Sequence, residues 1–189
     1  MQNKLECKVC TEPTCLGLNG ECSAEPTYAQ KVACEDETRV HREVVDQLLR
    51  KVARELLHRG LMHDASKLEE PELSGFAKYL PLMKSVAFGS PEYELFRAKL
   101  GPSLAQHYKV NSHHPEHDRA NGVMGMTLID LTEMLCDWSA SSKRNANGSI
   151  EKSLQICKDR FKISDELAQI LWNTVLSLKL EGGGEKSGV

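Results

Sequence analysis

The pattern of apolar and polar residues along the chain predicts helices and no strands. Between residues 38 and 60 apolar side chains recur at helical spacing, and Gly60 is expected to end this helix. His41 lies on the same stripe, which is expected to face inward. The stripe consists of Val45, Leu48, Val52 and Leu56. Since no useful stretch alternates with the period of a β-strand, the pattern predicts an all-α fold of about six or seven helices.

Turn and capping residues divide the rest of the chain into shorter helices. The sequence LMHDASKLEEPEL predicts a turn that leads into a short helix. Residues 74–88 predict a helix that is broken near Pro81. Ser90 and Ser164 are expected to cap the helices that follow them. The other helices are predicted at residues 91–100, around 104–108, and at 126–142, 150–158 and 164–180, with a polar loop over 111–125.

Composition divides the chain into three parts. Residues 1–35 are rich in Cys, Pro, Gly and Glu and predict an appendage, residues 36–180 a helical domain, and residues 181–189 a disordered tail. A length of 189 residues fits one domain with such an appendage. No apolar stretch is long enough to predict a transmembrane helix or a secretory signal, so a cytoplasmic protein with no membrane partner is expected.

Charge and cysteine content narrow the chemistry. A net charge of −3 gives no strong signal for nucleic-acid binding, although a small phosphorylated ligand needs only a local positive site. Five of the seven cysteines precede residue 35, beginning with a Cys-x-x-Cys pair. Their irregular spacing favours a flexible segment with reduced thiols over a small zinc knuckle. The zinc knuckle would be held by Cys7, Cys10, Cys15 and Cys22.

Histidine and carboxylate residues suggest a metal centre in the helical domain. His63-Asp64 places an imidazole and a carboxylate at one point of the backbone. On the predicted helix 126–142, Asp130, Glu133 and Asp137 share one face beside an apolar stripe. A carboxylate at the edge of a core is costly unless it is paired or binds a metal. Four histidines lie close together in sequence: His107, His113, His114 and His117.

The order of these residues resembles the HD superfamily of metal-dependent phosphohydrolases. Its pattern is a His, a His-Asp pair and a distant Asp, each from a different helix of an all-α bundle. The resemblance implies an HD-like bundle and favours Asp137 over Asp130 as the last ligand. The ligands it implies are His41, His63, Asp64 and Asp137. HDASK also resembles a His-Asp-x-x-Lys motif of HD phosphodiesterases, which would make Lys67 the lysine that faces phosphate.

The loop HHPEHD resembles a paired-histidine stretch of HD-GYP proteins. This likeness implies a role in a second metal or in substrate binding for His113 and His114, with His107 and His117 as further candidates. The GYP segment is missing, which argues against cyclic-di-GMP hydrolysis. The histidine that binuclear members place between the HD and HH motifs has no clear equivalent here, which favours one metal over two. The chain is also similar to an uncharacterised phage and bacterial HD-like family with an N-x-HH loop and a later E-M-x-x-D-W helix.

The function implied by the resemblance is hydrolysis of a nucleotide or related phosphate ester by a metal-activated water. Two imidazoles and two carboxylates suit a divalent metal such as Mn, Co, Fe, Zn or Mg. Asp64, Lys67 and Glu133 are the expected catalytic residues, with Glu133 either a base or a partner of a ligand. The alternatives are a diiron HD-type oxygenase and a non-catalytic nucleotide-binding HD domain. A homo-oligomer is left open, because many helical phosphohydrolases associate.

Overall fold

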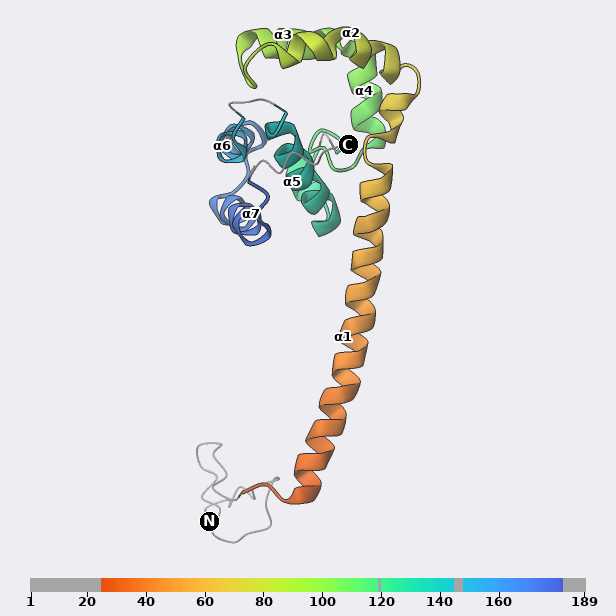
Figure 1. Ribbon diagram of the computed structural model, residues 1–189, viewed down its shortest axis with the longest axis vertical. Coiled ribbons are helices and arrows are strands. Elements are labelled where there is room, and N and C mark those ends of the chain that lie inside the picture. Colours follow the sequence, from red (N-terminus) through yellow and green to blue (C-terminus); the bar gives the residue numbers. More distant parts are fainter. Residues whose placement is uncertain (1–24, 119, 145–147, 182–189) are drawn as a thin grey trace, which may run out of the picture. The chain divides into compact units, whose positions relative to one another are not determined.

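The computed structural model describes residues 25–118, 120–144 and 148–181. Within these ranges the chain forms seven α-helices, two 3₁₀ helices and no strand, which confirms the predicted all-α fold (Figure 1). The elements are α1 (Tyr28–Met62), η2 (Ala65–Leu68), α2 (Glu72–Lys84), α3 (Pro91–Lys99), α4 (Gly101–Val110), η3 (Gly122–Gly125), α5 (Leu128–Ser142), α6 (Ile150–Phe161) and α7 (Asp165–Leu178).

The chain divides into two compact units, one ending at Lys51 and the other beginning at Val52. The described part of the first unit is the greater part of α1, and the second unit holds the end of α1 and all the other helices. The expected tail lies almost wholly outside the described residues. The four cysteines of the expected zinc knuckle, Cys7, Cys10, Cys15 and Cys22, lie outside them altogether.

Helix α1 extends beyond both of its predicted ends. It includes residues 28–37, and it continues through Gly60 to Met62, because Gly60 keeps a right-handed helical conformation instead of the left-handed one that ends many helices. The expected inward stripe is exposed in the first unit, where Val45 and Leu48 are 38% and 60% exposed. The described part of this unit holds no second element for the stripe to pack against.

Helix α2 packs closely against α4 in the second unit, and η2 contacts both helices. Gly75 permits this approach, because a Cβ at this position would lie 2.1 Å from Ser103 Oγ on α4. The Ser103 hydroxyl donates a hydrogen bond to the carbonyl oxygen of Pro71, at 2.8 Å. The start of α2 is therefore held beside α4.

Pro81 does not break α2, contrary to the sequence prediction. It lies in the last turn of the helix, which continues to Lys84. A proline removes the backbone hydrogen bond to the carbonyl oxygen four residues earlier, and only three helical residues follow Pro81, so the disturbance lies near the end of α2. The predicted caps Ser90 and Ser164 are confirmed, since each side chain accepts a hydrogen bond from a backbone N–H in the first turn of its helix.

The apolar core of the second unit is formed by α5, α6 and α7, with α6 contacting both other helices. Its buried members are Met134, Leu135, Ile150, Leu154, Leu171 and Val175. Thr127 and Asp130 form a capping box at the start of α5. Among the described helices, none has the length and apolar character that crossing a bilayer requires.

We expect Met134→Ala to lower the free energy of unfolding by about 2–5 kcal/mol, because it leaves a cavity in this core. Met134 is 1% exposed, whereas Met124 is 90% exposed. The matched control Met124→Ala should change stability by less than about 0.5 kcal/mol. Urea unfolding measures both values, and equal losses in the two variants would contradict the assignment of the core.

Candidate metal centre

His63 and Asp64 lie between α1 and η2. The backbone of Asp64 is left-handed, with φ 56° and ψ 17°, a conformation that Asp adopts more readily than most residues. At this residue the chain leaves α1 and turns into η2. Although the two residues are adjacent in sequence, His63 Nε2 and Asp64 Oδ2 lie only 3.5 Å apart.

Three further histidines come from α4 and the loop that follows it. His107 lies in the last turn of α4, and His113 and His114 lie just after the end of this helix at Asn111. His107 and His113 are almost completely buried, at 1% and 2% exposed. The Nε2 atoms of His107 and His114 face each other at 2.8 Å.

Helix α5 supplies two carboxylates one turn apart, Glu133 and Asp137. Their spacing places both on the face of α5 that meets His63. Asp137 Oδ1 lies 3.7 Å from His63 Nε2, and Glu133 Oε1 lies 2.9 Å from His63 Nδ1. The two carboxylates therefore lie on opposite sides of the same imidazole.

These side chains form two overlapping groups of candidate metal ligands. The first group consists of Asp64, His107, His113 and His114, and the second of His63, His113 and Asp137. Within each group the donor atoms all lie within 4.8 Å of one another. His113 belongs to both groups, so they form one continuous cluster, which we call the donor cluster.

Two buried, unpaired atoms indicate that the donor cluster is suited to bind a cation. Asp64 Oδ1 and His113 Nε2 are both buried, and neither has a hydrogen-bond partner among the described residues. They lie 3.6 Å apart, and Asp64 Oδ1 is also 3.4 Å from His107 Nε2. Buried polar atoms are nearly always satisfied, and a metal ion between a carboxylate and two imidazoles would satisfy these.

Glu133 supports the donor cluster from behind. Its Oε1 accepts a hydrogen bond from Nδ1 of His63 at 2.9 Å and lies 3.0 Å from Nδ1 of His113, so each Nε2 points into the cluster. Its Oε2 accepts a hydrogen bond from Arg59 at 3.1 Å. Glu133 therefore contacts two candidate ligands, and its role, as a base or as the partner of a ligand, stays a prediction.

Arg59 also ties the start of α5 to the histidine loop. One guanidinium nitrogen lies 3.1 Å from Asp130 Oδ1 and donates to Ser112 Oγ at 2.9 Å. Ser112 in turn donates to Asp130 at 2.6 Å. Asp130 is therefore engaged by its helix cap, by Ser112 and by Arg59, away from the donor cluster.

Lys67 contacts the donor cluster through Asp64. Its ammonium group pairs with Asp64 Oδ2 and lies 4.8 Å from the centre of the Phe76 ring. Burial alone would raise the pKa of Asp64, but the charge and hydrogen bond of Lys67 hold it below its ordinary value. Asp64 is therefore ionised at neutral pH.

The imidazoles fall into two electrostatic classes. Mainly because of the Asp137 carboxylate, and against the effect of burial, the pKa of His63 is raised to about 9. Burial, with the neighbouring imidazoles His113 and His107, lowers the pKa of His114 to about 3. Burial also lowers the pKa of His107 and His113. These three imidazoles are thus neutral, which is the form that binds metals.

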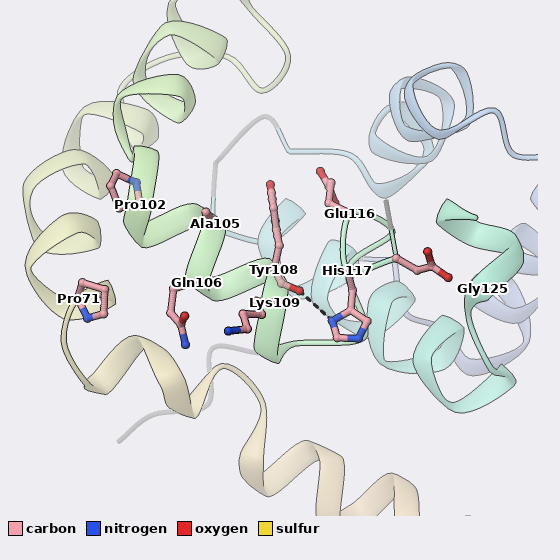
Figure 2. A pocket seen from close by; sticks show the side chains of 10 residues that line it. Pro71, Pro102, Ala105, Gln106, Tyr108, Lys109, Glu116, His117 and Gly125 are labelled. Atoms are coloured by element: carbon pink, nitrogen blue, oxygen red, sulfur yellow. Dashed lines mark hydrogen bonds between the residues drawn. The ribbon is translucent and has the colours of Figure 1, made fainter. Parts of the chain in front are cut away.

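Two of the histidines named from the sequence lie outside both ligand groups. His41 is exposed on α1 in the first unit, and its role as a ligand stays a prediction. His117 Nδ1 donates to the carbonyl oxygen of Tyr108 at 2.9 Å, and the ring lines a surface cavity of about 1050 Å³ (Figure 2). Gln106 and Lys109 line the same cavity from a face of α4 different from that of His107.

Sequence reasoning missed two supporting residues, Arg59 and Glu72. Arg59 lies in the last turn of α1, four residues before His63, and this closeness in sequence offered a usable signal. Glu72 lies in the first turn of α2, where an acidic residue is common for local electrostatic reasons, so nothing nearby marked it. It is nevertheless 1% exposed and lies 2.8 Å from His107 Nδ1.

We expect Co²⁺ binding at pH 7 to release about one proton from His63, because a ligating imidazole must be neutral. With a pKa of about 9, His63 carries this proton at pH 7, and metal affinity should rise as the pH increases toward 9. Calorimetry in buffers of different ionisation enthalpy measures the release. His63→Gln should abolish it, whereas the control His58→Gln should retain it. Equal proton release by both variants would contradict this role.

Comparison with known proteins gives a family but no activity. The chain matches no curated protein and no solved structure. One family model, described as a family of unknown function, matches residues 30–177. This span covers most of the chain and contains the whole donor cluster. The chain therefore belongs to DUF5662, a family of unknown function.

Proposed function

We propose that this protein is a metal-dependent phosphohydrolase of the HD type that acts on a nucleotide or a related phosphate ester. The observation that carries the proposal is the convergence of His63, Asp64 and Asp137 with the buried imidazoles of the second unit. This convergence supports the resemblance seen in the sequence, in which a His-Asp pair and a distant Asp share one metal. The residues that would hold the metal are those of the donor cluster.

A divalent ion bound there would supply a Lewis acid and a water of lowered pKa. The choice of ion is narrowed by the donor set of imidazoles and carboxylates, which suits Mn, Fe, Co or Zn better than Ca. Asp64 is held ionised by Lys67, and Glu133 keeps two imidazoles turned toward the cluster. These contacts hold the charge of Asp64 and the orientation of the two imidazoles in place without substrate.

Lys67 is the candidate for binding a substrate phosphate. Its side chain is 32% exposed, and its ammonium group pairs with Asp64. Lysine binds phosphate oxygens as a compact point charge. A phosphate placed against Lys67 would therefore lie next to the donor cluster, where negative charge develops during hydrolysis.

The two ligand groups also favour a second candidate, a diiron oxygenase. Sharing of His113 would allow two neighbouring ions, and His63, His113 and Asp137 have the two-His, one-carboxylate composition found in non-haem iron oxygenases. Two irons per chain with oxygen uptake would favour this candidate. Nucleotide binding without turnover, with any of the metals, would instead indicate a binding domain.

We expect Asp64→Ala to lose bound metal and to lower hydrolysis by about 100-fold or more, because loss of even an outer partner costs a metal site roughly 10–100-fold. Elemental analysis and phosphate release from a panel of nucleotides measure the two effects. The control Asp159→Ala alters an exposed residue of α6 and should change neither. Hydrolysis that persists after metal is lost from Asp64→Ala would contradict the proposal.

A further inference from the structure

Glu72 is a deeply buried carboxylate at the start of α2, with no role assigned by the sequence. It is 1% exposed, and its Oε1 has no hydrogen-bond partner among the described residues. Burying a half-satisfied carboxylate costs stability, and an apolar side chain of similar size would avoid that cost. Glu72 lies beside the donor cluster, where a carboxylate can serve a function that an apolar side chain cannot.

The second oxygen of Glu72 is held in a defined network. Oε2 accepts a hydrogen bond from Ser66 Oγ at 2.9 Å and lies 2.8 Å from His107 Nδ1. The side-chain amide of Asn111 donates to Ser66 Oγ and to the carbonyl oxygen of His107, both at 2.9 Å. The same amide nitrogen lies 3.0 Å from His107 Nδ1, but both of its hydrogens are used in these two bonds. Since a carboxylate oxygen accepts, the hydrogen between His107 and Glu72 belongs to His107 Nδ1.

This assignment decides which nitrogen of His107 is free. With Nδ1 donating to Glu72, the lone pair of a neutral His107 lies on Nε2. Nε2 faces Asp64 Oδ1 at 3.4 Å and His114 Nε2 at 2.8 Å. Carboxylates behind ligating imidazoles fix the ring and its tautomer in this way in metal sites.

Glu72 and Glu133 support different parts of the donor cluster. Glu133 binds His63 and His113, and His113 belongs to both ligand groups. Glu72 binds His107, which belongs to the four-residue group of Asp64, His107, His113 and His114. Removing the charge of Glu72 therefore affects one group, whereas removing that of Glu133 affects both.

We propose that Glu72 is a positioning residue that sets the metal affinity of the four-residue group without affecting the group of His63, His113 and Asp137. The inference rests on the metal centre of the proposed function, but not on the identity of the substrate. The network of Glu72, Ser66 and Asn111 would then control the affinity of one metal position.

The test is titration of Co²⁺ into the metal-free full-length chain. Calorimetry gives the number of ions and their affinities, and the visible absorption of bound Co²⁺ reports the ligand geometry. Glu72→Gln keeps the size of the side chain and should weaken one ion by roughly 10–100-fold while leaving the other unchanged. Glu133→Gln should weaken both ions. The matched control Glu69→Gln, at an exposed position, should weaken neither.

If the wild-type chain binds a single ion, weakening by Glu72→Gln supports the inference and unchanged affinity overturns it. Equal weakening of two ions, no effect, or no binding by the wild type also overturns it. Circular dichroism checks the fold. Should Glu72→Gln fail to fold, Ser66→Ala, which removes a donor to Glu72, should weaken the same ion, and no change would overturn the inference.

Phosphate release from nucleotides, measured on the same samples, separates this inference from the proposed function. If Glu72→Gln weakens the binding of one ion but the protein hydrolyses no phosphate ester, the positioning role is supported and the phosphohydrolase function is contradicted. Metal-dependent hydrolysis with Co²⁺ affinities that Glu72→Gln leaves unchanged would give the opposite result.

Discussion

The carboxylate of Glu133 joins three segments of the second unit that are distant in sequence. It accepts hydrogen bonds from His63 at the end of α1 and from Arg59 one turn earlier, and it contacts His113 in the loop after α4. Because both imidazoles use Nδ1 for this carboxylate, both present Nε2 to the same small volume. The direction of these candidate ligand nitrogens thus depends on a residue that would not itself touch a bound metal.

The region around these imidazoles holds more acidic than basic side chains, which is the second constraint on the site. Four carboxylates surround the imidazoles, namely Asp64, Glu72, Glu133 and Asp137, and the fixed cations that pair with them are Arg59 and Lys67. The neighbouring carboxylates, above all Asp137, raise the pKa of His63 to about 9, so that protonated His63 supplies a further positive charge. A bound divalent cation would replace that proton and balance more of the acidic charge, which links metal binding to pH.

Local patterns predicted the helices well where the signal was a cap or a periodic face. Ser90 and Ser164 cap the predicted helices, and His63-Asp64 and Asp137 lie in the ligand groups named above. Prediction failed where a single residue was expected to end or break a helix. Gly60 lies within α1 and Pro81 within α2, because neighbouring residues with good helical geometry outweigh one unfavourable position.

The sequence by itself determined the all-α class and placed most of the histidines and carboxylates that could bind a metal. Only the tertiary structure decided how these residues are supported. Glu72 meets His107 across 35 residues, and Glu133 meets His63 across 70. Helical periodicity reports which residues share a face within about two turns, whereas these contacts depend on how α2 packs on α4 and on how α5 meets the end of α1. The physical reason is that side-chain packing between helices, which has no local signature, brings the buried acids behind the imidazoles.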